Sequence, residues 1–214
     1  MKIGILGTGD VGCTLAGGLA SLGHEVRLGT RDPSADKARA AAARAGRGCD
    51  VATFADAAAF AELVILATLW SGTENALRLA GPKNLAGKVV IDATNPLVFS
   101  PGAPPSLALG FDDSGGEQVQ RWLPGAKVVK AFNIVGHASM VKPSFPDGPP
   151  DMFICGNDAA AKQTVTGLLT ALGWPVTDIG GIEGARLLEP LCILWVLYGM
   201  KSGGWNHAYK MLRR

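Results

Sequence analysis

Residues 2–22 read KIGILGTGDVGCTLAGGLASL, and this stretch decides the fold of the chain. A short apolar run at 2–6 predicts a β-strand, and an apolar segment with helical spacing at 10–22 predicts a helix. Between them, Gly7 permits a tight turn, Gly9 lets the backbone approach a pyrophosphate, and Gly12 lets the helix pack closely on the strand. The helix N-terminus offers unpaired N–H groups to phosphate oxygens. The pattern predicts a dinucleotide-binding loop made of Gly7, Thr8, Gly9, Asp10, Val11 and Gly12.

The end of the next predicted strand indicates which dinucleotide binds. An Asp or Glu at this tip accepts hydrogen bonds from the ribose hydroxyls of NAD and repels a 2′-phosphate. Here the tip carries Thr30 and Arg31, a hydroxyl and a planar cation suited to phosphate, and Asp32 comes one position later. Lys37 on the following predicted helix adds a second cation. The sequence therefore favours NADP(H) over NAD(H), with a merely solvated Arg31 as the alternative.

The chain goes on alternating short β-like runs with helix-like segments, which predicts an α/β fold of the Rossmann type, a doubly wound and mostly parallel sheet. The predicted strands are 2–6, 25–29, 50–54, 63–67, 88–92 and 127–131, and the predicted helices are 10–22, 34–45, 55–61, 71–80 and 116–123. Two loops rich in proline and glycine, 95–106 and 142–150, follow strand ends at which such sheets bind ligands. We expect these loops to form walls of the active site.

The last third of the chain reads as a small addition to that sheet. We expect a strand at 151–155, a helix capped by Asn157 that runs to 172, a strand at 175–179, and helices at 189–200 and 204–212. Because no linker precedes this part, we expect an NADP-binding Rossmann domain at 1–150 and an α/β and helical addition at 151–214 packed on it.

Composition excludes several classes of protein. Of 214 residues, 48% are hydrophobic and 18% are charged, which excludes a disordered chain. The net charge of +2 gives no basis for binding nucleic acid or an anionic membrane. Four widely spaced cysteines indicate reduced thiols, and the N-terminus lacks a signal-peptide pattern, so we expect a cytoplasmic protein. The apolar stretch at 187–200 is too short to span a bilayer and contains Glu189 and Pro190.

Four short motifs, in register over essentially the whole chain, carry a resemblance to a known family. They are GTGDVG at 7–12, GHEVRLGTR at 23–31, DATNPL at 92–97 and VVKAFN at 128–133. In these the chain resembles the coenzyme F420-dependent NADP oxidoreductases, and it is similar to the cytoplasmic domain of the six-transmembrane metalloreductases. The resemblance implies a Rossmann domain with a small C-terminal addition, usually dimeric, in which hydride passes between a nicotinamide and a deazaflavin or flavin stacked against it.

The resemblance also implies roles for individual residues. It assigns Thr8, Gly9, Asp10 and Val11 to the pyrophosphate, and Thr30 with Arg31 to the 2′-phosphate. It implies a cofactor-contacting loop at Thr68, Leu69 and Trp70, and a border of the nicotinamide made of Asn95, Pro96, Ala131, Phe132 and Asn133. Archaeal deazaflavin enzymes tend to carry His where this chain has Asn133, which is closer to the metalloreductase pattern. The acceptor therefore stays open between coenzyme F420 and the flavins FMN and FAD.

The proposed chemistry needs few catalytic groups. Hydride transfer between two bound rings needs the reacting carbons held about 3–3.5 Å apart with water excluded, and neither a nucleophile nor a metal. His137 is the one histidine near the expected site and could donate a proton to the reduced acceptor, and Asn133 could position the rings. Two other functions stay open: direct reduction of a small imine or carbonyl, and sensing of NADP without turnover.

The apolar C-terminal segment suggests self-association. Pro190 suits the first turn of a helix, and the residues after it are apolar nearly all round: Leu191, Ile193, Leu194, Trp195, Leu197 and Tyr198. A helix of this kind has to be buried on most sides. We therefore expect a symmetric homodimer in which this helix packs against the partner, with burial inside its own subunit as the alternative. The other expected partner is a small-molecule electron acceptor.

Overall fold

The computed structural model describes residues 1–212 and 214 of the chain. In this part of the chain one eight-stranded sheet has the order β10-β9-β8-β5-β4-β1-β2-β3. Its strands are β1 (Lys2–Leu6), β2 (Glu25–Thr30), β3 (Cys49–Thr53), β4 (Leu63–Leu66), β5 (Val89–Asp92), β8 (Lys127–Lys130), β9 (Met152–Gly156) and β10 (Val176–Asp178). The first six of these strands in the chain run parallel, and β9 pairs antiparallel with β8. The Rossmann-type fold is confirmed.

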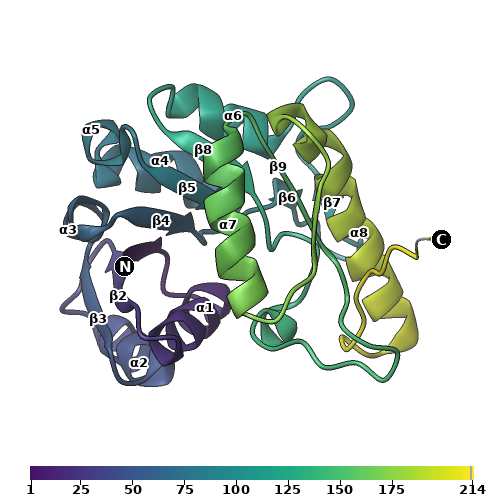
Figure 1. The fold of residues 1–214 in the computed structure, drawn as a ribbon, viewed down its shortest axis with the longest axis horizontal. Coiled ribbons are helices and arrows are strands. Elements are labelled where there is room, and N and C mark those ends of the chain that lie inside the picture. The colour runs from purple at the N-terminus through teal and green to yellow at the C-terminus, as the bar shows by residue number, and fades with distance from the viewer. Residues whose placement is uncertain (213) are drawn as a thin grey trace.

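Helices cover both faces of the sheet (Figure 1). One face carries α1 (Asp10–Ser21), α2 (Asp36–Ala45) and α7 (Ala159–Ala171). The other carries α3 (Phe54–Phe60), α4 (Trp70–Ala80), the short α5 (Pro82–Leu85) and α6 (Gly115–Trp122). The central strands are therefore buried on both sides, which explains why β4 reads LVIL and all four of its residues are buried.

The remaining elements lie around the β8–β10 half of the sheet. A two-stranded hairpin, β6 (Leu97–Val98) with β7 (Ser106–Leu107), forms where a loop was expected at 95–106 and extends one residue beyond it. The long helix α8 (Ala185–Ser202) contacts β7 and α6 and stands at the end of the molecule away from α2 (Figure 1). The described residues also form two short 3₁₀ helices, η1 (His137–Ser139) and η2 (Ile182–Gly184). In residues 1–212 and 214, no helix has the length and apolarity needed to cross a bilayer.

Most predicted elements are confirmed to within two residues, and three predictions in the last third are wrong. Residues 204–212 are not a helix, because Gly203 adopts φ +68° and ends α8, after which the chain folds back. The side chain that caps α7 is Asp158, since its carboxylate accepts from Ala161 N, whereas Asn157 accepts from Ile182 N. Pro190 lies inside α8, which begins five residues earlier at Ala185.

The returning C-terminal segment packs along α8. Trp195 Nε1 donates to the carbonyl of His207 (2.7 Å), and Tyr209 donates its hydroxyl to the carbonyl of Leu191 (2.8 Å). Trp195 is therefore engaged within its own chain. An exposed apolar face remains on α8, with Leu187, Leu194, Leu197, Tyr198 and Met200. The homodimer stays a prediction, as does the division at residue 150, which lies between two neighbouring strands of the same sheet.

Candidate active site

A cleft of about 790 Å³ follows the carboxyl ends of β1, β2, β4 and β5. Such an edge is where open α/β sheets bind ligands. Eleven residues expected at the site line it: Gly7, Thr8, Gly9, Asp10, Val11, Thr30, Arg31, Lys37, Thr68, Leu69 and His137. The lining also includes residues that the sequence motifs did not indicate: Phe54, Ala67, Ser71, Gly72, Asn75, Ala76 and Ala93.

The glycine loop leaves room for a phosphate. Gly7 has φ +132°, and a Cβ built there would lie 2.2 Å from the carbonyl oxygen of Ala67. A Cβ on Gly12 would lie 2.3 Å from the carbonyl oxygen of Gly7, so α1 can approach β1 only with glycine at that position. A Cβ on Gly9 would meet nothing within 4 Å and would occupy the cleft. These three glycines fit a dinucleotide pyrophosphate seated on the N-terminus of α1.

Two cations stand at one end of the cleft. Arg31 and Lys37 are both exposed and both line it, next to the buried Thr30. Asp32 is occupied elsewhere, because its Oδ1 accepts from Ser34 N (2.9 Å) and Ser34 Oγ (2.6 Å). The hydrogen bond from the Ser34 side chain lowers the pKa of the Asp32 carboxyl. This carboxylate stays ionised but lies outside the cleft lining, whereas the two cations Arg31 and Lys37 belong to it, so positive charge dominates at this end.

Arg44 is a charged neighbour that the sequence motifs did not indicate. Asp10 lines the cleft in the first turn of α1, where its charge would repel a phosphate. Arg44, in the last turn of α2, donates from Nη2 to Asp10 Oδ1, and this bond lowers the pKa of the Asp10 carboxyl. The pair offsets the negative charge of Asp10. No local motif points to Arg44, because it lies 34 residues further along the chain.

His137 lines the cleft and is exposed at the start of η1. Its Nδ1 lies 3.4 Å from Thr14 Oγ1 of α1, so the two elements meet at the rim of the cleft. An exposed imidazole at this rim is accessible to a ligand that occupies the cleft.

Seven expected residues lie outside the cleft lining, and the first of them is Gly12, whose close packing is described above. Trp70 stacks on Trp122, with ring centroids 5.5 Å apart, and Pro96, Ala131 and Phe132 are buried. The structure brings the last two, Asn95 and Asn133, together through their side chains. Asn133 Nδ2 donates to Asn95 Oδ1 (3.0 Å) and to the carbonyl of Leu188 (2.9 Å), and Asn95 Nδ2 donates to the carbonyl of Asn133 (2.8 Å). This amide pair joins the β5 and β8 ends to α8 from behind the cleft wall.

A buried cluster of charge lies in the same region and was missed by the sequence reasoning. Lys130 Nζ donates to Asp92 Oδ2 (2.9 Å) and to Glu189 Oε1 (2.7 Å). The side chains of Lys130 and Asp92 are fully buried, and that of Glu189 is 2% exposed. We call these three residues the buried triad. A lysine between Val129 and Ala131 at the end of an apolar strand was the available signal, since buried lysines need partners.

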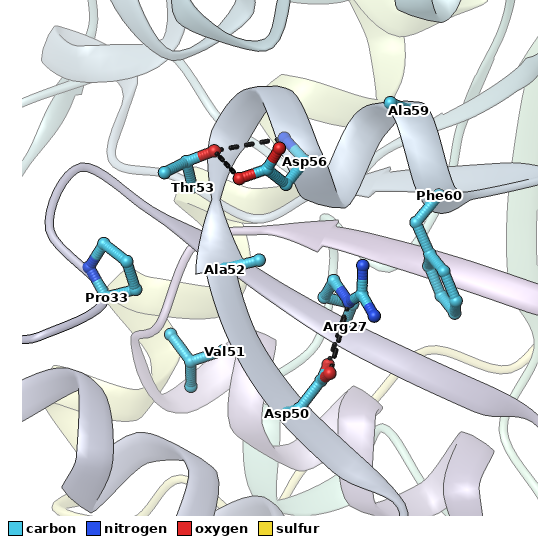
Figure 2. Close-up of a pocket in the computed structure, with 9 residues that line it drawn as sticks. All are labelled: Arg27, Pro33, Asp50, Val51, Ala52, Thr53, Asp56, Ala59 and Phe60. Carbon is cyan, nitrogen blue, oxygen red and sulfur yellow. Dashed lines mark hydrogen bonds and ion pairs between the residues drawn. The ribbon is translucent and has the colours of Figure 1, made fainter.

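A second hollow, of about 580 Å³, lies at the outer edge of the sheet along β3 (Figure 2). Its polar groups are used within the chain. Arg27 Nε donates to both oxygens of Asp50 (3.1 and 3.3 Å), and its guanidinium lies 4.1 Å from the centroid of the Phe60 ring. Thr53 Oγ1 donates to Asp56 Oδ2 (2.6 Å). These polar side chains are therefore already bonded to one another. We interpret the hollow as an edge of the sheet and not as a reaction site.

Known proteins resemble this chain both in sequence and in fold. The family model described as NADP oxidoreductase coenzyme F420-dependent matches residues 2–96. An F420-dependent NADP reductase of Methanocaldococcus jannaschii is 33% identical over 213 residues, 94% of this chain and 93% of that protein. The metalloreductase STEAP3 of Rattus norvegicus is 30% identical over 190 residues, 89% of this chain but 36% of that protein.

Solved structures extend these similarities to the fold. A candidate F420-dependent NADP reductase from Arthrobacter sp. FB24 has 47% sequence identity and a TM-score of 0.93, and the match covers 100% of both chains. An imine reductase of Streptomyces aurantiacus has 21% identity and a TM-score of 0.66, covering 94% of this chain and 64% of that one. At that identity, the second likeness concerns the fold alone.

Proposed function

The chain belongs to the F420-dependent NADP oxidoreductase family and is an NADP-dependent oxidoreductase, and from this premise we propose that it transfers hydride between NADP(H) and bound coenzyme F420 or a flavin. The observation that carries the proposal is the cleft itself. It runs from the Arg31 and Lys37 cations, past the open space at Gly9, to Ala93 and His137. The cleft therefore offers a phosphate-binding end, a pyrophosphate seat and an end at which a ring could react.

The residues present would hold NADP(H) in one orientation. The N–H groups at the start of α1 would bind the pyrophosphate, because the glycine loop leaves that space open. Thr30, Arg31 and Lys37 would bind the 2′-phosphate, a planar guanidinium being well suited to it. The nicotinamide would then lie towards Ala93 and His137, at the opposite end of the cleft.

When bound, NADPH supplies the hydride, and the chain's own residues supply position and a proton. Asn95 and Asn133 act as positioning residues, since their hydrogen bonds fix the β5 and β8 ends against α8 behind the nicotinamide end. His137 is the proposed proton donor to the acceptor, because it is exposed at the rim of the cleft. Such a site works mainly by alignment, and a misplacement of about 1 Å can slow transfer about 100-fold.

The test is anaerobic stopped-flow absorbance of NADPH mixed with coenzyme F420, FMN, FAD, a cyclic imine or no acceptor. We expect oxidation of NADPH with the deazaflavin or a flavin. Asn133→Ala is expected to lower turnover about 100-fold while the Kd for NADPH changes little. Asn84→Ala is the matched control, since that amide donates to the carbonyl of Ala80 on α4 and should leave turnover unchanged.

Two outcomes would contradict the proposal. If NADPH stays reduced with every deazaflavin and flavin while the imine is reduced, the protein is a direct imine or carbonyl reductase. If NADPH binds and no acceptor is reduced, it is an NADP sensor.

A further inference from the structure

The ionisation of the buried triad follows from its hydrogen bonds. Asp92 Oδ1 accepts from Thr94 N (2.9 Å) and Thr94 Oγ1 (2.7 Å), and its Oδ2 accepts from Lys130. Glu189 Oε1 accepts from Lys130 and Gly116 N (3.0 Å), and its Oε2 accepts from Gly115 N (2.9 Å). Every carboxylate oxygen thus faces a donor, which is the pattern of two ionised carboxylates.

The ammonium group of Lys130 is charged as well. Burial alone would lower the pKa of Lys130, but the carboxylates of Asp92 and Glu189 outweigh burial and raise it above its usual value. Two carboxylates and one ammonium leave one net negative charge. The N-terminus of α6, whose N–H groups contact Glu189, offsets about half a charge, so the sign of the cluster stays negative.

This charge is carried by residues next in the chain to those at the nicotinamide end of the site. Asp92 precedes Ala93, which lines the cleft. Glu189 follows Leu188, whose carbonyl accepts from Asn133 of the amide pair. The triad is sealed from solvent, so neither water nor salt screens it as they screen the exposed cations near Arg31.

We propose that the buried triad is an electrostatic element of the site, whose net negative charge makes the protein bind oxidised NADP⁺ more tightly, relative to NADPH, than the cleft contacts alone would. The inference rests on the proposed function, which places the nicotinamide at the Ala93 end. In hydride transfer a ring C–H bond breaks and its electron pair leaves with the hydrogen for the acceptor, so the nicotinamide gains one positive charge. A fixed negative charge nearby favours that product and drives hydride towards the acceptor.

The test compares the Kd of NADP⁺ with the Kd of NADPH by calorimetry, without any acceptor. Glu189→Gln removes the charge in nearly the same volume. We expect the ratio Kd(NADP⁺)/Kd(NADPH) to rise about 3- to 20-fold, the order of magnitude of one charge–charge interaction at an effective dielectric constant of about 20. Asp113→Asn is the matched control, because it removes a carboxylate just before α6 that is partly exposed and paired with Arg121, and the ratio should not change.

The proposal would be overturned if a folded Glu189→Gln protein kept the wild-type ratio. An equal loss of affinity for both cofactors would give that result, because a purely structural role changes both dissociation constants together. If Glu189→Gln does not fold, Asp92→Asn removes the other carboxylate, and the ratio must rise in the same direction. A wild-type protein that binds neither cofactor would contradict the proposed function and this inference with it, whereas tight binding of both cofactors with a ratio that Glu189→Gln leaves unchanged would contradict the inference alone.

Discussion

Two regions hold paired charges in opposite ways: the open end of the cleft, from Arg31 to the glycine loop, and the sealed end, next to Ala93. In the Asp10–Arg44 pair the side chains are 60% and 53% exposed, whereas in the Asp92–Lys130 pair both are fully buried. Exposed pairs contribute about 0–1 kcal/mol, because water already solvates both partners. Breaking a buried pair costs about 3–5 kcal/mol, because the remaining charge loses its partner in a medium of low polarity. We therefore expect the open end to select a ligand by direct contact and the sealed end to fix the structure.

Lys130→Met would give the largest effect. It leaves Asp92 and Glu189 buried without their shared cation, so we expect the free energy of unfolding to fall by about 3–5 kcal/mol in urea denaturation. Lys127→Met is the control, since Lys127 pairs with Asp158 at the surface and its loss should cost at most about 1 kcal/mol. Equal losses in the two variants would remove the distinction between the two kinds of pair.

Arg31→Ala tests the open end by ligand binding. A charge-assisted hydrogen bond to phosphate contributes about 1.5–3 kcal/mol, so the Kd for NADPH should rise about 10- to 150-fold while the Kd for NADH barely changes. Titration of both cofactors into both proteins measures this. A wild-type protein that binds NADPH and NADH equally would refute the selection by Thr30 and Arg31.

Arg44→Ala should have a smaller effect that does not discriminate between cofactors. It exposes the Asp10 carboxylate where the pyrophosphate would bind, and we expect both NADPH and NADH to weaken about 5-fold at low salt. Added salt should reduce the effect, because this pair is exposed. In the background of Asp10→Asn, removing Arg44 should not cause this loss, and a persisting loss would mean that Arg44 contacts the ligand itself.

Leu194→Glu tests the predicted homodimer and should change cofactor affinity least. Leu194 is 55% exposed on α8, unlike Trp195, which packs against His207 of its own chain. If the exposed α8 face contacts a partner, light scattering should show dimers for the wild type and monomers for this variant. A monomeric wild type at micromolar concentration would contradict the prediction.

The sequence predicted the open end of the cleft because each of its parts is local. Gly7, Gly9 and Gly12 sit in one turn between a strand and a helix, and Arg31 ends the next strand. Their placement follows from chain geometry, and all but Gly12 line the cleft. Gly12 instead lets α1 approach β1, as expected.

The sealed end depends on contacts that no local pattern encodes. Asn95 and Asn133 are 38 residues apart, and Lys130 is 59 residues from Glu189. From the sequence, Glu189 is only an obstacle to a membrane span, whereas in the structure it lies on the buried side of α8 together with Ala185, Leu188 and Cys192. The failed helix at 204–212 has a similar cause, because Trp195 and Leu191 of α8 bind that segment through tertiary contacts.

The long separation within the buried triad also constrains the order in which the molecule folds. On a ribosome that adds about 5–20 residues per second, Glu189 is made about 3–12 s after Lys130. During that interval β8 can pair with β5, and Asp92 can meet the lysine, but the second carboxylate is still missing. The nucleotide-binding half therefore cannot seal its own interior during synthesis. Closure awaits α8, so the reaction end is completed late in synthesis, when only the segment that packs back along α8 is still to be added.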